Sequence, residues 1–234
     1  MTGIVALVTL SSLLTLPEPL LWLRPDGRIT VEGKMVEPTY SPGTRRIRIR
    51  EGTAFDFDGK RSGILLADLP VFHLQDEITV SCWIYLRTYW NDGPGTQIFF
   101  RGDDRCGLDP YTLVVHGNGT AHFGVQDAEQ NCGSVSTEVP LFRWVHLMGT
   151  FSRERGRVEF YRDGVHVAFT TTSKAPLFDL DPAWAPGIGI GNVQNEKGPH
   201  NQPLNGSIFD LRLYRSVLTP DQVAPFPGIA DPPL

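Results

Sequence analysis

The sequence predicts an all-β protein folded as an antiparallel sandwich of two packed sheets. Several segments alternate apolar and polar side chains with a period of two, which is the pattern of a strand with one buried face. In the clearest of them, residues 77–86, apolar side chains occupy every second position: Ile78, Val80, Cys82, Ile84 and Leu86. The chain also contains 24 glycines and 19 prolines without a low-complexity run, which indicates many tight turns between short strands. No segment longer than about one turn has helical periodicity.

Composition and length favour a single domain. A sandwich of this class can reach 234 residues as one unit, and 41% hydrophobic residues are enough for a sizeable core. We expect residues 19–226 to form this domain and residues 227–234 to be a C-terminal tail. The formal net charge of -5 argues against nucleic acid as a partner, because a nucleic-acid surface needs a clustered positive field.

Residues 3–16 form an apolar run that has the length of a signal-peptide core and is too short to span a bilayer. No Lys or Arg precedes this run, and no small-residue cleavage site stands before Pro17. Residues 1–18 are therefore interpreted either as a signal peptide or as an N-terminal apolar segment such as a first strand. Export would make the protein extracellular or periplasmic, and a cytoplasmic location stays open. No membrane span is predicted.

The first half of the domain begins with a short strand between prolines, at residues 20–23. Residues 45–50 alternate arginine with Ile47 and Ile49, which predicts an exposed strand whose charged edge discourages pairing with another sheet. A basic ligand-binding patch is the alternative interpretation. A further strand at residues 53–57 ends at an Asp-Gly turn, and the strand at residues 77–86 is placed centrally.

The second half continues the same pattern and ends in a brief helical turn at residues 219–223. Its predicted strands cover residues 97–101, 111–116, 120–125, 143–151, 187–191 and 207–214. From these patterns we expect the core to include Phe57, Ile78, Val80, Cys82, Ile84, Val145, Leu147, Phe160, Val167, Ile188, Ile190, Leu211 and Leu213.

The clearest hairpin spans residues 158–169 and turns at Asp163-Gly164. Pairing outward from that turn sets Phe160 opposite Val167 and Val158 opposite Phe169, all on one face. The other face receives Glu159, Tyr161, His166 and Ala168.

Four pieces of the chain together carry a family resemblance. They are Ala54-Phe-Asp-Phe-Asp-Gly59, Ile78-Thr-Val-Ser-Cys-Trp83, residues 143–151 with residues 158–164, and residues 205–214 followed by Leu218-Thr-Pro-Asp221. In order and spacing they resemble the laminin G-like branch of the concanavalin A-like lectin/glucanase superfamily, from residue 53 to residue 223. The resemblance implies a curved jelly-roll sandwich, and such domains commonly act as carbohydrate-binding or adhesive modules.

The resemblance also allows the chain to be compared with the enzymes that share this fold. Glucanases on this fold present Glu-x-Asp-x-Glu on one strand, so that two carboxylates can act as nucleophile and acid. This chain lacks that motif, and Asp56 and Asp58 are better explained by a strand end that enters a turn. No two of the six histidines have metal-ligand spacing on a helix. We therefore predict a non-catalytic binding module and not a glycoside hydrolase.

Ligand recognition is expected at one rim built from three long loops, residues 89–93, 103–109 and 192–202. Stacking aromatics and amides supply the apolar faces and hydrogen bonds that a sugar requires. The candidate ligand-binding residues are Tyr89, Trp90, Asn91, Asp92, Asn192, Asn195 and His200. Packing of the aromatics over a sheet end is the alternative. The expected partner is a glycan or a cell-surface protein. The alternative function is a structural or protein-interaction domain of a surface assembly with no glycan ligand.

Two further expectations concern loop chemistry. Related folds often hold calcium at a loop rim, and Asp103, Asp104 and Asp109 supply oxygen ligands within one loop; solvated carboxylates are the alternative. Cys106 and Cys132 lie in loop-like stretches and would form a disulfide in an exported chain, or would otherwise be unrelated thiols. Cys82 is expected to be a buried thiol.

Overall fold

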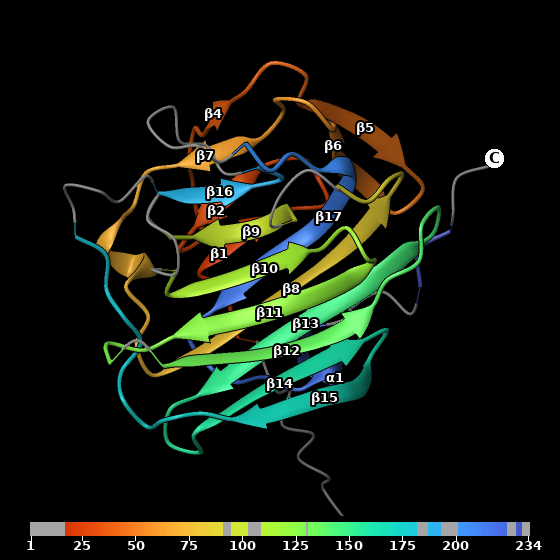
Figure 1. Ribbon diagram of the computed structural model, residues 1–234. Helices are drawn as coiled ribbons and strands as arrows, with labels where there is room; N and C mark the ends of the chain where they lie inside the picture. The colour runs from red at the N-terminus through yellow and green to blue at the C-terminus, as the bar shows by residue number, and fades with distance from the viewer. Residues whose placement is uncertain are drawn as a thin grey trace, which may run out of the picture.

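The computed structural model is a sandwich of two antiparallel sheets that pack face to face (Figure 1). It describes residues 17–90, 95–102, 109–129, 131–181, 187–192, 201–223 and 228–230. The N-terminal apolar run and Cys106 lie outside the described residues. Within these ranges no helix is long and apolar enough to cross a bilayer. The predicted fold class is confirmed.

The larger sheet follows the order β15-β14-β13-β8-β17-β1-β2-β3, and β6 also pairs with β17 and carries β5. Its strands are β1 (Leu21–Leu23), β2 (Ile29–Val31), β3 (Lys34–Met35), β5 (Arg45–Ile49), β6 (Gly52–Asp58), β8 (Glu77–Leu86), β13 (Trp144–Ser152), β14 (Arg157–Arg162), β15 (Val165–Thr171) and β17 (Asn205–Tyr214).

The smaller sheet follows the order β12-β11-β10-β9-β16-β7-β4. Its strands are β4 (Thr39–Tyr40), β7 (Ile64–Leu66), β9 (Thr96–Arg101), β10 (Tyr111–Val115), β11 (Thr120–Gln126), β12 (Cys132–Glu138) and β16 (Ile188–Ile190). Two short helices complete the described elements: the 3-10 helix η1 (Pro70–Phe72) and α1 (Pro220–Val223).

The core lies between the two sheets, and β8 is central to it. This strand has the predicted boundaries and pairs with β13 on one side and β17 on the other. Its five alternating apolar side chains are buried, and so are all the other predicted core residues except Val167. Val167 is 38% exposed, so its assignment to the core was wrong.

A β-bulge explains the error at Val167. The hairpin pairs Arg162 with Val165 and Tyr161 with His166, as the turn predicts, but Phe160 then lies opposite Ala168. Val167 is the extra residue, and the shift sends Ala168 to the core side. The predicted pairings of Phe160 with Val167 and of Val158 with Phe169 are therefore wrong, as is the placement of Ala168 on the outer face.

A second bulge interrupts β17 between Phe209 and Arg212, where Asp210 has a φ of 53°. Ile208 packs in the main core, whereas Phe209 packs with Trp83 and Trp144 on the outer side of the larger sheet. Strict alternation along β17 would have placed Phe209 on the same face as Leu211, so the bulge exchanges the faces of the strand's first half.

Cys132 is the exposed first residue of β12 and does not lie in a loop, in contrast to the sequence-based prediction. This strand was not predicted, because its sequence is mostly Ser, Thr and Gly with Val135 as the one buried apolar side chain. The pairing of Cys106 with Cys132 stays a prediction.

Candidate functional site

The predicted rim residues fall at opposite ends of the sandwich. Consecutive antiparallel strands leave a sheet at alternate ends, so the loop after β8 and the loop after β9 lie a strand length apart. In the register of β9 and β10, Thr96 pairs with Val115 and Arg101 pairs with Tyr111. Tyr89 lies beyond the first of these pairs and Asp109 beyond the second. The expectation of one common rim was therefore wrong.

We call these two regions the Tyr89 end (residues 87–90, 116–119, 139–142 and 191–192) and the Arg101 end (residues 68–76, 101–102, 109–110 and 172–181). Some predicted residues lie outside the described ranges: Asn91, Asp92, Asp103, Asp104, Asn195 and His200.

At the Tyr89 end, the side chains of two predicted ligand-binding residues, Tyr89 and Asn192, form hydrogen bonds within the protein. The Tyr89 hydroxyl donates to the Val139 carbonyl at 2.6 Å, and its ring lies against Gly119, where an added Cβ would be 3.0 Å from the Tyr89 Cζ. Burial, together with the charge of Glu138, raises the pKa of Tyr89. Packing over a sheet end, the alternative interpretation, is what the structure shows for Tyr89. Trp90 is half-buried.

Asn192 is buried as well. Its Nδ2 donates to Asn201 Oδ1 at 2.7 Å, and its Oδ1 accepts from the backbone N–H of Gln202 at 2.8 Å. The side chain therefore holds the ends of its own loop together, and its role as a ligand-binding residue stays a prediction.

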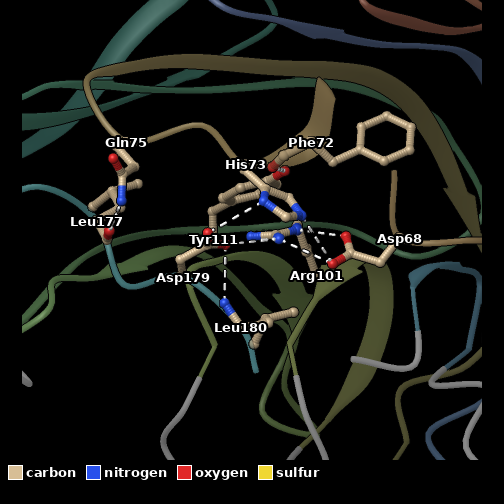
Figure 2. Close-up of polar contacts among 9 residues, drawn as sticks. All are labelled: Asp68, Phe72, His73, Gln75, Arg101, Tyr111, Leu177, Asp179 and Leu180. Atoms are coloured by element: carbon tan, nitrogen blue, oxygen red, sulfur yellow. Dashed lines mark hydrogen bonds and ion pairs between the residues drawn. The ribbon is translucent and has the colours of Figure 1, made fainter. Parts of the chain in front are cut away.

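The Arg101 end contains a charged cluster around a fully buried guanidinium group (Figure 2). Arg101 Nε donates to Asp68 Oδ1 at 2.9 Å, and its Nη2 donates to Asp68 Oδ2 and to Asp179 Oδ1, each at 3.1 Å. Burial opposes the charge, but the hydrogen bonds to Asp68 and Asp179 and the neighbouring charges together outweigh it and raise the pKa of Arg101. Arg101 Nη1 is buried and has no hydrogen-bond partner among the described residues.

His73 and Tyr111 complete this cluster, which we call the rim clamp: Asp68, His73, Arg101, Tyr111 and Asp179. His73 Nε2 lies 3.3 Å from Asp68 Oδ2, and its Nδ1 lies 3.2 Å from Asp179 Oδ2 (Figure 2). The Tyr111 hydroxyl donates to the Phe72 carbonyl at 2.7 Å. The rim clamp thus ties four segments together: the stretch after β7, the end of β9, the start of β10 and the stretch before β16.

The chemistry of the rim clamp favours positioning over catalysis. Both carboxylates are paired with the guanidinium, and no group of three or more His, Cys, Asp or Glu side chains is placed to hold a metal ion in the described parts of the chain. Its members come from four distant segments with no motif spacing. Sequence reasoning therefore missed it, and a buried arginine at a strand end carries no signal of its partners.

A second cluster lies on the solvent side of β14 and β15. We call it the outer-face cluster: Arg157, Glu159, Tyr161, His166 and Phe169. Arg157 Cζ lies 4.0 Å from the centre of the Phe169 ring, and Arg157 Nε donates to Glu159 Oε1 at 2.9 Å. His166 Nε2 lies 3.5 Å from the same oxygen. The Phe169 side chain is 56% exposed, so the cluster presents an aromatic ring to solvent.

The bulge at Val167 creates this cluster. His166 and Phe169 are three residues apart, and a regular strand would point them to opposite faces. The extra residue brings both to the outer face, where their rings stack at 6.2 Å between centres. The Tyr161 ring meets the His166 ring edge-on at 5.1 Å. Burial, with Glu159 as the next contribution, raises the pKa of Tyr161.

A buried Ser–His pair occurs on the outer side of β8 and β13, under the C-terminal segment. Ser81 Oγ lies 2.9 Å from His146 Nε2, and His146 Nδ1 has no partner among the described residues. The nearby Asp210 is bonded to Arg212 and Trp22. Because no carboxylate in the described part of the chain orients the imidazole, and both residues are buried, this pair lacks the arrangement of a catalytic triad there.

Comparison with known families agrees with this architecture. A laminin G-type model of the concanavalin A-like lectin/glucanases superfamily matches residues 58–224. The chain belongs to this superfamily. No curated protein sequence matches it.

Three solved structures have a similar fold. The chain is similar to the binding domain of Paraclostridial Mosquitocidal Protein 1, with a TM-score of 0.64 and 13% identity over 87% of this chain and 49% of that one. It is also similar to the botulinum neurotoxin DC binding domain in complex with SialylT (TM-score 0.65, 11% identity, 88% and 49% covered). For the same domain in complex with rat synaptotagmin II, the TM-score is 0.66 and the identity is 12%, over 88% of this chain and 50% of that one. The chain spans about half the length of these structures, and at this identity the likeness concerns the fold.

Proposed function

We propose that this superfamily member is a non-catalytic binding module that recognises carbohydrate through the outer-face cluster. The observation that carries the proposal is the solvent-facing Phe169 ring, held between a guanidinium and an imidazole beside the Glu159 carboxylate. A sugar binds to such a surface by placing a C–H face on the ring and its hydroxyls on the charged groups.

The expected affinity is weak. An aromatic contact contributes only about 1 kcal/mol beyond the area that it buries, so a single site should bind in the micromolar to millimolar range, on the order of 6 kcal/mol. Useful retention would then come from several copies on one surface. An exported protein is the setting that this mode of binding fits.

The named ligands of the similar structures point the same way without carrying the proposal. One botulinum neurotoxin DC binding domain holds SialylT and another holds rat synaptotagmin II, a glycan-type and a protein ligand. The shared fold can therefore present either kind of surface, and the choice for this chain rests on its own residues.

A protein partner is the second candidate function, and a specific observation favours it. Val165, Val167 and Phe169 are exposed along β15, which is an edge strand of the larger sheet in the described topology. A free edge with apolar side chains can accept a strand from another protein. This would make the chain an interaction domain of a surface assembly.

A glycan array with matched variants separates these functions. Phe169→Ala should abolish the signal from neutral glycans, whereas Phe142→Ala, which removes another exposed aromatic on a different surface, should keep it. Trp90→Ala tests the predicted contact at the Tyr89 end in the same way. An array with no signal for the unmodified protein would reject carbohydrate as the ligand and favour the interaction domain.

A further inference from the structure

Strand β5 carries a row of exposed arginines on a chain whose net charge is negative. Arg45, Arg46, Arg48 and Arg50 are all exposed, the last in the turn after the strand. Among the described residues, no ion pair forms with Arg45, Arg48 or Arg50. Asp56 lies directly opposite Arg45 in the register, but its carboxylate accepts from Arg87 and Ser207 instead. Three of the four arginines are therefore without an ion pair among the described residues, whereas Arg46 also lines a second cavity that contains Asp26 and Glu37.

A cavity of about 320 Å³ opens beside the first of these arginines. Its lining is Tyr40, Thr44, Arg45, Arg46 and Phe55, without a carboxylate. Arg46 Nη2 donates to the Tyr40 hydroxyl at 2.7 Å, and its Cζ lies 5.1 Å from the centre of the Tyr40 ring. These contacts hold the guanidinium in place before any ligand arrives, which lowers the entropy that binding must overcome.

The alternation of side chains along β5 also determines which face of the strand carries the other arginines. Ile47 and Ile49 pack against the cluster of Ala54, Trp83, Trp144 and Phe209 on the outer side of the sheet. Arg46 and Arg48 therefore share the opposite face of β5, roughly 7 Å apart, because alternate residues of a strand are separated by two rises. Arg50 follows beyond the end of the strand. The spacing suits an extended polymer with a negative group on each repeat.

Protection of a free edge accounts for some charge on β5, which pairs only with β6 in the described sheet. It does not account for a cavity that combines two guanidinium groups with an aromatic wall. Guanidinium groups bind sulfate and carboxylate oxygens through pairs of parallel hydrogen bonds. An aromatic wall accepts the face of a sugar ring.

We propose that Tyr40, Arg45, Arg46, Arg48 and Arg50 form a binding site for a linear anionic glycan that carries sulfate or carboxylate groups. This site is separate from the outer-face cluster, and its ligand class does not depend on the proposed function. The glycan is preferred over an anionic membrane because the charges follow one strand beside a ring-sized cavity, and do not spread over a flat face.

The test uses a fluorescent heparin octasaccharide titrated into the full chain at about 50 and 200 mM salt. The unmodified protein should bind the probe and lose affinity steeply with salt, since each neutralised anionic group releases a counterion. The Arg46→Ser/Arg48→Ser variant should weaken binding about tenfold or more and reduce the slope of log K against log salt by roughly two. Arg155→Ser/Lys174→Ser, with the same charge change at the opposite edge of the sheet, should bind like the unmodified protein.

Three further arms identify the source of the interaction. De-sulfated probe, which keeps its carboxylates, should bind less tightly and lose less affinity with salt, and Tyr40→Phe should bind less tightly because Arg46 loses its hydrogen-bond partner. Equal weakening by both double variants would show that only net charge matters and would overturn the site. Binding to phosphatidylserine vesicles with none to the octasaccharide would overturn the glycan, and an unchanged Arg46→Ser/Arg48→Ser variant would overturn the assignment to β5. Unaltered thermal melts for each variant exclude misfolding as the cause.

Discussion

Ser81 on β8 and His146 on β13 are diagonal neighbours, with Oγ 2.9 Å from Nε2, beneath the outer surface of the larger sheet. Burial, with the charge of Arg212 as a second cause, lowers the pKa of His146 to about 4. The imidazole is therefore neutral in the folded protein at neutral pH, although it would take up a proton in the unfolded chain near pH 6.5.

This difference predicts a loss of stability in mild acid. The unfolded chain binds the proton first, so the free energy of unfolding should fall between about pH 6.5 and pH 4, by up to about 3 kcal/mol. His146→Gln should flatten this part of the profile, as measured by urea unfolding. In the folded state the pKa of Asp58 is lowered to about 2, because hydrogen bonds from Ser62 and nearby backbone N–H groups outweigh the effect of burial. The stability that ionised Asp58 contributes is therefore lost only below about pH 3.8. An equally steep fall of the free energy of unfolding in His146→Gln would assign the effect to other groups.

The rim clamp should contribute strongly to stability. Asp68→Asn leaves the buried Arg101 guanidinium with half of its charge pairing, and removing one partner of a buried pair costs about 3 kcal/mol or more. Asp76→Asn is the matched control, because its ion pair with Arg153 is exposed and should contribute less than about 1 kcal/mol. Chemical denaturation of both variants measures the difference. Equal costs would mean that the clamp is not needed to hold the Arg101 end together.

Cys82 should resist thiol reagents in the folded protein. Burial, with a further effect from Asp210, raises the pKa of this thiol well above its ordinary range. Iodoacetamide labelling followed by peptide mapping should modify Cys82 only after the chain is unfolded in urea. Rapid modification in native buffer would contradict the central position of β8.

Calcium binding in the loop between β9 and β10 is proposed from the crowding of Asp103, Asp104 and Asp109. An ion that binds only the folded state raises the melting temperature by mass action, so millimolar calcium should stabilise the protein and a chelator should reverse the shift. Asp103→Asn/Asp104→Asn should remove the response. Identical melts with calcium and with chelator would dismiss the site.

Sequence alternation predicted most strands of this fold, including the exact limits of β8, because one buried face forces a period of two. It failed where one residue was added to a strand. The bulges at Val167 and Asp210 each send the side chains of part of a strand to the opposite face of the sheet. The residue types at these positions do not predict a bulge. β12 was missed because its inner face is built from Gly133 and Val135 among polar neighbours.

The candidate sites were harder to predict for the same reason. The loops that carry Tyr89 and Asp109 looked like one rim in the sequence, but antiparallel connectivity sends them to opposite ends. The outer-face cluster depends on the bulge at Val167, and the rim clamp depends on four segments that meet only in the folded chain. Composition could suggest sugar-binding chemistry but could not place it.

The most direct test of carbohydrate recognition is a titration of isotope-labelled protein with soluble oligosaccharides, cellohexaose and sialyllactose, followed by NMR. Binding at the outer-face cluster should shift the amide signals of residues 157–169, leave residues 87–90 unchanged, and disappear in Phe169→Ala. Shifts confined to the Tyr89 end, with the signals of β14 and β15 unmoved, would contradict the account and place recognition in the loops.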